Sequence, residues 1–350
     1  MTAAPLLLIG TYTTDRASLG TYLCSIDARN QLRVRGVCAA ADPSFVVRHP
    51  HLPLAYAVNE LPEGYGSVSV LTIDAVHHRV EVQQQVTSGG EAPCHVAVAA
   101  DGSGLFVAHY GCGTVRWLGL DILGRLTGET HAVQHEGSSV RPRRQASAHP
   151  HCVVLCSSAA RGNGVYVTDL GQDCIVHYGF EPASGLIERS RSALHAGAGP
   201  RHLCFAQDDP VAFVGNELDN TVSTLAVDAG GHLTELHWRS TLPENCPQRS
   251  AIGEIALHPS GRWLYVSNRG IDTISWFTVA GGELTWGGMV PSQGQHPRHF
   301  LVTPDGRHLI VANRDADNLV LFSIDQHSGA PLAPGVISTE VPAPVCVCWL

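Results

Sequence analysis

A two-part pattern of hydrophobic and polar positions recurs along the chain roughly every 50 residues. Each copy opens at a proline or glycine and continues with about six residues that alternate between apolar and polar. A turn, often Asp-Gly or Ser-Gly, leads to a second alternating run that ends in Asn or a charged residue. Residues 297–302 followed by 309–314 are one clear copy. Because alternation is typical of strands with one buried face, each copy predicts two antiparallel strands.

Seven copies fit along the chain, and the last of them is incomplete. They open at Pro43, Pro93, Pro150, Pro200, Gly253, Pro297 and Pro344. The copy at Pro344 stops after one run, whereas residues 6–12 form a second-type run with no first run before it. We therefore expect the N-terminal strand to join the C-terminal blade and close a ring.

Two further alternating runs follow each pair, for example residues 273–279 and 283–286. Four short antiparallel strands in each repeat are typical of a β-propeller blade. The sequence predicts an all-β protein in which residues 1–350 form a single seven-bladed propeller domain. Two β-sandwiches are the alternative, but they leave the half-copies at the chain ends unexplained.

Composition and charge exclude several classes of protein. The formal net charge is −9 at pH 7, and no arginine-rich stripe runs along the chain, so we expect no nucleic-acid partner. No apolar run is long enough to span a bilayer, so we expect no membrane partner. All 22 basic residues are Arg, and the absence of Lys excludes Schiff-base chemistry, pyridoxal phosphate and a Walker-A site. The 11 scattered Cys include no CxxC pair, which favours a reducing, cytoplasmic setting.

The propeller prediction gathers two sets of side chains at one mouth of the central channel. The first strand of a blade lines the channel, and its start lies beside the end of the antiparallel second strand. The positions that start the first strands hold Ser44, Cys94, His151, Arg201, Glu254, Arg298 and Val345. The positions that end the second strands hold Tyr12, Glu60, Tyr110, Asp169, Glu217, Arg269 and Arg314. Mixed cations and carboxylates in one cleft suit acid-base chemistry and an anionic ligand.

Several of these residues also have a purely structural interpretation. Arg201 and Glu217 fit a structural ion pair within one blade. By strand alternation, His202 and His299 are expected to point away from the channel into the sheet. His149 and His151 share a strand face, but no further ligands accompany them, so we expect no metal.

The chain lacks the motifs of several enzyme classes. It contains no GxSxG, no HExxH, no complete dinucleotide-binding glycine loop and no EF-hand loop. These absences disfavour a serine hydrolase with a covalent intermediate, an NAD enzyme and a calcium sensor, and we expect no cofactor.

Several phrases resemble the seven-bladed propeller lactonase family. They are residues 9–13 (Ile-Gly-Thr-Tyr-Thr), 197–202 (Gly-Ala-Gly-Pro-Arg-His), 216–218 (Asn-Glu-Leu), 268–270 (Asn-Arg-Gly) and 297–300 (Pro-Arg-His-Phe). The family includes the propeller-type 6-phosphogluconolactonase of bacteria and the fungal carboxy-cis,cis-muconate lactonizing enzyme. The resemblance covers essentially the whole chain.

The resemblance implies a site. In the fungal branch one His, two Arg and one Glu have been proposed as the site, and by motif they match His151, Arg201, Glu217 and Arg269. We interpret these four as catalytic, with either His151 or Glu217 as the general base. We interpret a second group as substrate-binding, namely Arg298, Glu254, His149 and Arg144. Arg298 and Arg144 would hold a phosphate, although the run that contains Arg144 also fits a solvated loop.

The resemblance implies a metal-independent lactonase that acts on 6-phosphogluconolactone in the pentose phosphate pathway. The expected partner is a small anionic lactone or sugar acid, and the protein is expected to be a monomer or a homodimer. Three alternatives remain: a muconate lactonizing enzyme, a lactonase for unphosphorylated sugar acids, and a propeller scaffold that binds other proteins.

Overall fold

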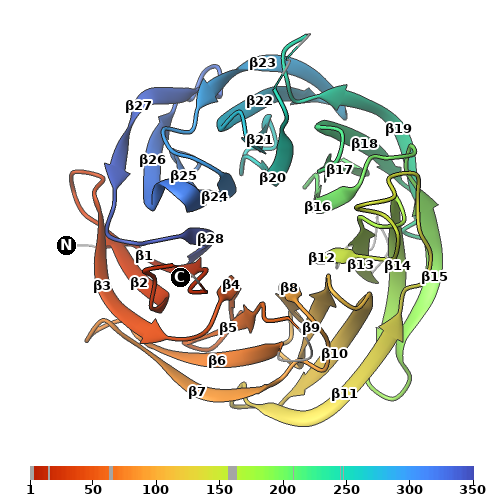
Figure 1. Ribbon diagram of the computed structural model, residues 1–350, viewed down its shortest axis with the longest axis horizontal. Helices are drawn as coiled ribbons and strands as arrows, with labels where there is room; N and C mark the ends of the chain where they lie inside the picture. The colour runs from red at the N-terminus through yellow and green to blue at the C-terminus, as the bar shows by residue number, and fades with distance from the viewer. Residues whose placement is uncertain are drawn as a thin grey trace.

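The computed structural model describes residues 4–14, 16–62, 66–156, 164–207, 209–244, 246 and 248–350. Within these residues, seven four-stranded antiparallel sheets surround a central channel as the blades of a propeller (Figure 1). This arrangement confirms the predicted fold class. The described residues contain one short helical turn, η1 (Arg314–Ala316), and no helix among them is long and apolar enough to cross a membrane.

The strands of each blade run outward from the channel in chain order. The innermost strands are β4 (Pro43–Arg48), β8 (Pro93–Val98), β12 (Pro150–Cys156), β16 (Pro200–Phe205), β20 (Ala251–Leu257), β24 (Pro297–Val302) and β28 (Pro344–Trp349). The second strands are β5 (Leu54–Asn59), β9 (Gly104–His109), β13 (Gly164–Asp169), β17 (Val211–Asn216), β21 (Trp263–Arg269), β25 (His308–Asn313) and β1 (Leu6–Thr11). The third strands are β6 (Ser67–Asp74), β10 (Thr114–Leu120), β14 (Cys174–Glu181), β18 (Thr221–Val227), β22 (Thr273–Ala280), β26 (Asn318–Ile324) and β2 (Gly20–Ile26). The outermost strands are β7 (Arg79–Thr87), β11 (Leu126–Gln134), β15 (Gly185–Ala193), β19 (Leu233–Ser240), β23 (Glu283–Pro291), β27 (Pro331–Ser338) and β3 (Leu32–Ala39).

The two ends of the chain share one blade, as the incomplete repeat predicted. Its strand order is β28-β1-β2-β3, and Leu7 pairs with Trp349 while Ile9 pairs with Val347. This antiparallel pairing joins the two ends of the chain in one sheet and closes the ring.

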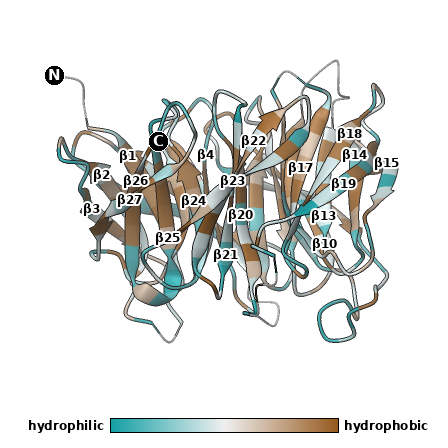
Figure 2. Ribbon diagram, turned by 90° about the horizontal axis from the view of Figure 1, so that it is seen from above, coloured by the Kyte–Doolittle hydropathy of each residue, from teal (hydrophilic) through white to brown (hydrophobic). Residues whose placement is uncertain are grey.

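The hydrophobic core lies between neighbouring blades, where the brown strand faces of Figure 2 meet. Residues of the second strands are almost completely buried because each of these strands is covered on both faces. A tyrosine recurs there: the hydroxyls of Tyr56, Tyr166 and Tyr265 donate to backbone carbonyls in the next blade at 2.8–2.9 Å. These buried hydrogen bonds tie adjacent blades together in addition to apolar packing.

A β-bulge recurs at the start of the innermost strands. In β16, Pro200 pairs with Asn216 but His202 pairs with Gly215, so the register skips Arg201. The same skip occurs in the other innermost strands, and the skipped residues are Ser44, Cys94, His151, Arg298 and Val345, with Gly253 and Glu254 in β20. Because a bulge redirects the side chains next to it, this feature decides which side chains face the channel.

Candidate active site

A buried carboxylate, Glu217, lies at the centre of one channel mouth and contacts three arginines. Its Oε1 is 2.6 Å from the guanidinium of Arg144, and its Oε2 is 2.8 Å from that of Arg269. Nε of Arg201 is 3.1 Å from the same Oε2, although its angle is too poor for a hydrogen bond. The structure thus brings together three of the four residues predicted to be catalytic, and adds Arg144 to them.

Each of these residues is held in place by the local backbone. Glu217 follows β17, and its amide donates to the carbonyl of Gly199 at 2.7 Å. Arg201 is the bulge residue of β16, and Arg269 ends β21. Arg269 also donates to the carbonyl of Ile252 at 2.6 Å, and Arg201 donates to that of Gly253. The guanidinium of Arg201 is therefore fixed by the neighbouring blade and that of Arg269 by its own blade, in addition to Glu217.

Arg144 reaches the mouth from the segment that joins β11 to β12. The next residue, Gln145, is fully buried and donates to Leu170 O at 2.9 Å and to Asp173 Oδ1 at 2.6 Å. Asp173 also accepts from the amide of Gly197 at 2.6 Å. These contacts anchor the segment below the surface, while the Arg144 side chain itself stays 45% exposed above Glu217.

The electrostatics give the carboxylate and the histidine different states. Burial alone would raise the pKa of Glu217, but the charges of Arg269 and Arg201 hold that pKa well below its usual range. Burial and the charge of Arg201 hold the pKa of His151 well below its usual range. Glu217 is therefore ionised and His151 neutral at pH 7. His151 Nε2 lies 4.0 Å from Glu217 Oε2, so the fourth predicted catalytic residue also faces the cluster.

Arg298 approaches the mouth from β24, the innermost strand of the blade that follows the blade of Arg269. Its guanidinium lies 5.1 Å from the ring centroid of Tyr12 and 3.7 Å from Glu60 Oε2. Both neighbours directly follow the second strands, β1 and β5, of other blades. Arg298 is thus a buried cation whose nearest carboxylate is Glu60.

His149 and Glu254 lie elsewhere. The His149 ring stacks on Tyr110 at 4.4 Å between centroids, and its Nδ1 is 2.7 Å from the Tyr110 carbonyl, so it supports Tyr110 instead of facing Glu217. Both oxygens of Glu254 are engaged below the mouth, by His202 Nδ1 at 2.8 Å and by His299 Nε2 at 3.1 Å. Burial raises the pKa of Glu254, while the charge of His299 opposes that rise.

The expected outward orientation of His202 and His299 is wrong. Their rings lie 6.0 and 5.7 Å from that of Phe45, which belongs to a different blade, so all three side chains meet inside the channel. His95 joins them, with its ring centroid 4.1 Å from that of Phe45. The bulge explains the error, because one skipped residue reverses the alternation after it. These rings form a floor below the mouth.

One trio of donors in the described part of the chain has the spacing of a metal site: His95, Cys152 and His202, within 4.8 Å of one another. Their polar atoms are already engaged. His95 Nδ1 accepts from the amide of Val153, which leaves the proton on Nε2, 3.4 Å from Cys152 Sγ. His202 lies between Glu254 and the cationic Arg201, which is 3.0 Å from its Nε2. Two occupied imidazoles beside a fixed cation do not suit a metal ion.

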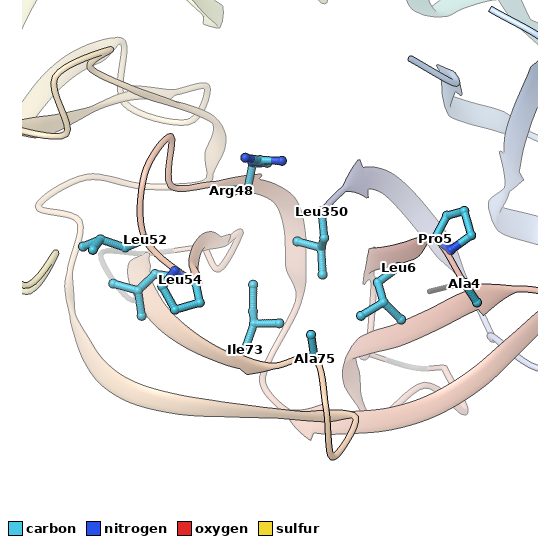
Figure 3. A pocket seen from close by; sticks show the side chains of 10 residues that line it. Ala4, Pro5, Leu6, Arg48, Leu52, Leu54, Ile73, Ala75 and Leu350 are labelled. Carbon is cyan, nitrogen blue, oxygen red and sulfur yellow. The ribbon is translucent and has the colours of Figure 1, made fainter. Parts of the chain in front are cut away.

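Two of the hollows among the described residues lie at opposite ends of strands β1 and β4. An apolar one of about 350 Å³ is lined by Leu6, Leu54, Ile73 and Leu350, with Arg48 as its charged side chain (Figure 3). It offers no acid-base pair. A polar one of about 320 Å³ lies at the mouth that holds Arg298, and its lining residues are Tyr12, Thr14, Arg16, Asp42 and Arg314. The polar hollow therefore lies on the same side of the propeller as the charged cluster.

These features define a class of protein: a seven-bladed propeller in which buried arginines surround a carboxylate beside a neutral histidine at one channel mouth. Residues 6–349 match the family described as the seven-bladed β-propeller lactonases, and the chain belongs to this family.

Individual relatives are similar over almost their whole length. The chain is 31% identical over 349 residues to a 6-phosphogluconolactonase of Bacillus subtilis (strain 168), covering 98% of this chain and 97% of that one. It is similar to the crystal structure of a Lactobacillus plantarum protein, with 31% identity, 99% of each chain covered and a TM-score of 0.90. It is also similar to a periplasmic gluconolactonase of Pseudomonas aeruginosa, with 28% identity, 99% of each chain covered and a TM-score of 0.87.

Proposed function

We propose that the protein hydrolyses a sugar-acid lactone and that its substrate is 6-phosphogluconolactone. The observation that carries the proposal is the cluster of Arg201, Arg269 and Glu217 beside neutral His151 at the polar mouth. Membership of the lactonase family supports this activity. The name of the Bacillus subtilis relative supports the phosphorylated substrate, whereas that of the Pseudomonas aeruginosa neighbour favours an unphosphorylated one.

Neutral His151 is the better candidate for the general base. Arginines engage both oxygens of Glu217, whereas His151 Nε2 makes no hydrogen bond with the residues that the structure describes. With its proton on Nδ1, beside the Cys94 sulfur at 4.0 Å, His151 directs the Nε2 lone pair toward the mouth. Ionised Glu217 would then stabilise the imidazolium that forms during the reaction.

The proposed reaction proceeds through a tetrahedral intermediate. A water oxygen attacks the lactone carbonyl carbon while one of its protons moves to His151 Nε2. The carbonyl electrons move onto oxygen, and the guanidinium groups of Arg201 and Arg269 stabilise that oxyanion. When the intermediate collapses, the ring carbon–oxygen bond breaks and His151 returns its proton to the leaving alkoxide. The product is an open-chain hydroxy acid.

Charge at the mouth favours an anionic substrate. The charged groups that meet there are Arg144, Arg201, Arg269 and Arg298, with Glu217 and Glu60. Four cations against two carboxylates leave a local positive excess in a chain whose net charge is −9. A phosphate dianion would balance that excess, and Arg298 is the side chain placed to bind it away from the reacting carbonyl.

The test is hydrolysis of freshly generated 6-phosphogluconolactone, coupled to 6-phosphogluconate dehydrogenase, with the spontaneous rate subtracted. Wild type is compared with the His151→Ala and Arg201→Ala variants. We expect a clear wild-type rate and at least a ~100-fold lower kcat/KM for Arg201→Ala. A background rate with wild type would refute this substrate and direct the next assays to gluconolactone and to carboxymuconate.

We also infer a reducing, cytoplasmic setting. The support is that all eleven cysteines lie within the described residues and are free thiols. The similarity to a periplasmic protein makes this worth testing by fractionation of the native host.

A further inference from the structure

A second carboxylate, Glu60, faces the same mouth and takes no part in the reaction above. Glu60 and Glu217 are equivalent in the repeat: each follows the Asn that ends a second strand. Each also donates its backbone amide to the carbonyl that precedes an innermost strand, from Glu60 to Asp42 at 2.9 Å and from Glu217 to Gly199 at 2.7 Å. The repeat therefore presents a carboxylate to the mouth from two separate blades.

The partners of the two carboxylates differ. Arginines engage both oxygens of Glu217. Oε2 of Glu60 accepts a hydrogen bond from the Tyr12 hydroxyl at 2.8 Å and lies 3.7 Å from Arg298, beyond hydrogen-bond distance. Oε1 of Glu60 has no hydrogen-bond partner among the residues that the structure describes, and the side chain is 18% exposed. Glu60 thus keeps one acceptor oxygen open to the mouth.

The groups around Glu60 have unused hydrogen-bonding capacity too. Arg298 stacks over the Tyr12 ring, and its guanidinium makes no hydrogen bond within the described part of the chain. Ser44, from the blade that carries Glu60, holds the same bulge position as His151 and Arg298 in their blades. It is only 4% exposed, and its hydroxyl has no partner. Buried polar groups are normally hydrogen-bonded, so this unmet capacity indicates a place for a polar ligand.

We infer that Glu60, together with Tyr12 and Ser44, forms a subsite for the hydroxyl groups of a polyhydroxylated lactone, next to the anion held by Arg298. This inference rests on the proposed function and deepens it. A carboxylate oxygen accepts strong hydrogen bonds from alcohols and repels other carboxylates. The subsite therefore selects sugar lactones over hydroxyl-free lactones and unsaturated polycarboxylates. Tyr12 is a positioning residue, since it acts by holding Glu60.

The experiment compares two lactones with the same six-membered ring, glucono-δ-lactone with its hydroxyls and δ-valerolactone without them. Loss of a hydrogen bond to a charged group lowers kcat/KM by about 10- to 100-fold, so we expect that loss for Glu60→Gln on glucono-δ-lactone. On δ-valerolactone we expect a change below about threefold. Glu129→Gln, on the exposed face of β11, is the matched control and should change neither rate. Equal losses on both lactones would overturn the inference.

A binding measurement separates this inference from the proposed function. Titration calorimetry compares D-gluconate with hexanoate, a carboxylate of the same carbon number without hydroxyls. We expect wild type to prefer gluconate and Glu60→Gln to lose that preference, even if neither lactone is hydrolysed. Tyr12→Phe, which keeps the ring under Arg298, should show a smaller loss in the same direction and serves if Glu60→Gln does not fold. No preference for gluconate in wild type would refute the subsite, whatever the hydrolysis assay gives.

Discussion

Replacing Glu217 by Gln separates two roles for this residue: counter-charge for the arginines, or general base. The substitution preserves shape and removes the charge that Arg201 and Arg269 share. Both guanidinium groups are buried, with side chains 4% and 10% exposed. Removing one partner of a buried ion pair costs about 3–5 kcal/mol, because the remaining charge stays desolvated. Arg144 adds little, since its half-exposed side chain is solvated.

For Glu217→Gln we expect a loss of stability at the lower end of the range of about 3–5 kcal/mol. Arg201 keeps its bond to the Gly253 carbonyl, and Arg269 keeps its bond to the Ile252 carbonyl. We therefore predict that Glu217→Gln lowers the free energy of unfolding by about 3 kcal/mol. Urea denaturation at pH 7, followed by circular dichroism and by tryptophan fluorescence, measures this loss and checks that the transition is two-state. Glu340→Gln, which removes an exposed partner of Arg33, is the control and should cost less than about 1 kcal/mol.

The stability difference between wild type and Glu217→Gln should also depend on pH. The pKa of Glu217 is lowered in the folded state, so its contribution to stability is present above its unfolded value of about 4.3. That contribution is lost as the pH falls through the folded value. The stability difference between wild type and variant should therefore stay constant between about pH 5 and 8 and shrink below about pH 4. A loss under about 1 kcal/mol at pH 7 would refute the role of Glu217 as counter-charge.

Three other predictions concern titration and blade packing. Burial lowers the pKa of His195, but Asp219 and Glu235, at 2.6 and 2.9 Å, raise it overall. The contribution of His195 to the free energy of unfolding should therefore be full below about pH 6.5 and be lost as the pH rises through the pKa of His195 in the folded protein. Urea denaturation at a series of pH values should find this loss in wild type and not in His195→Asn. Because the pKa of His151 is held well below its usual range by burial and by Arg201, kcat/KM on glucono-δ-lactone should fall only well below pH 6.5, and a midpoint at or above 6.5 would contradict that assignment. Tyr265→Phe, which removes a 2.8 Å hydrogen bond to the next blade, should cost about 1 kcal/mol in urea denaturation, and no measurable loss would show that the bond contributes nothing net.

The fold was predictable because its information is repeated in the sequence. Alternation in a single run is ambiguous, but seven copies in phase leave few architectures that bury every apolar face. The half-copy at Pro344 and the lone run before Tyr12 also determined how the ring closes, and the pairing of β28 with β1 confirms it. The cluster of Arg201, Glu217 and Arg269 followed from the same reasoning, since antiparallel strands bring the positions together.

What alternation could not predict was the bulge. The sequence of β24 reads as a regular alternating strand, so counting from Arg298 puts His299 on the opposite face. The bulge shows only in the register between two strands, so alternation within a single strand carries no signal of it. The recurrence of Pro before the skipped residue in six of the innermost strands is the signal that was available. Pro has no amide proton and commonly marks positions where pairing is interrupted.

The contact of Arg144 with Glu217 was beyond the repeat argument for a different reason. Arg144 lies in an insertion that no other blade contains, so its position depends on contacts such as Gln145 with Asp173 and not on periodicity. Sequence reasoning could only name it as one arginine in a basic run. The role of Gln145 in anchoring this segment could not be predicted either, because a Gln in a polar loop is not distinguishable in the sequence from a solvent-exposed one until its partner is known.

Under the proposed function, the chemistry of this propeller comes from positions at which the repeat differs between blades. The bulge positions of three consecutive blades hold small, uncharged residues, Val345, Ser44 and Cys94. The remaining positions hold His151, Arg201, Glu254 and Arg298. Since the bulge presents these positions to the same channel, the uncharged residues come from three neighbouring blades and the polar or charged ones from the other four. Under the proposed function, a substrate would be held against the charged side, and the equivalent carboxylates Glu60 and Glu217 would act differently because only Glu217 has arginines on both oxygens.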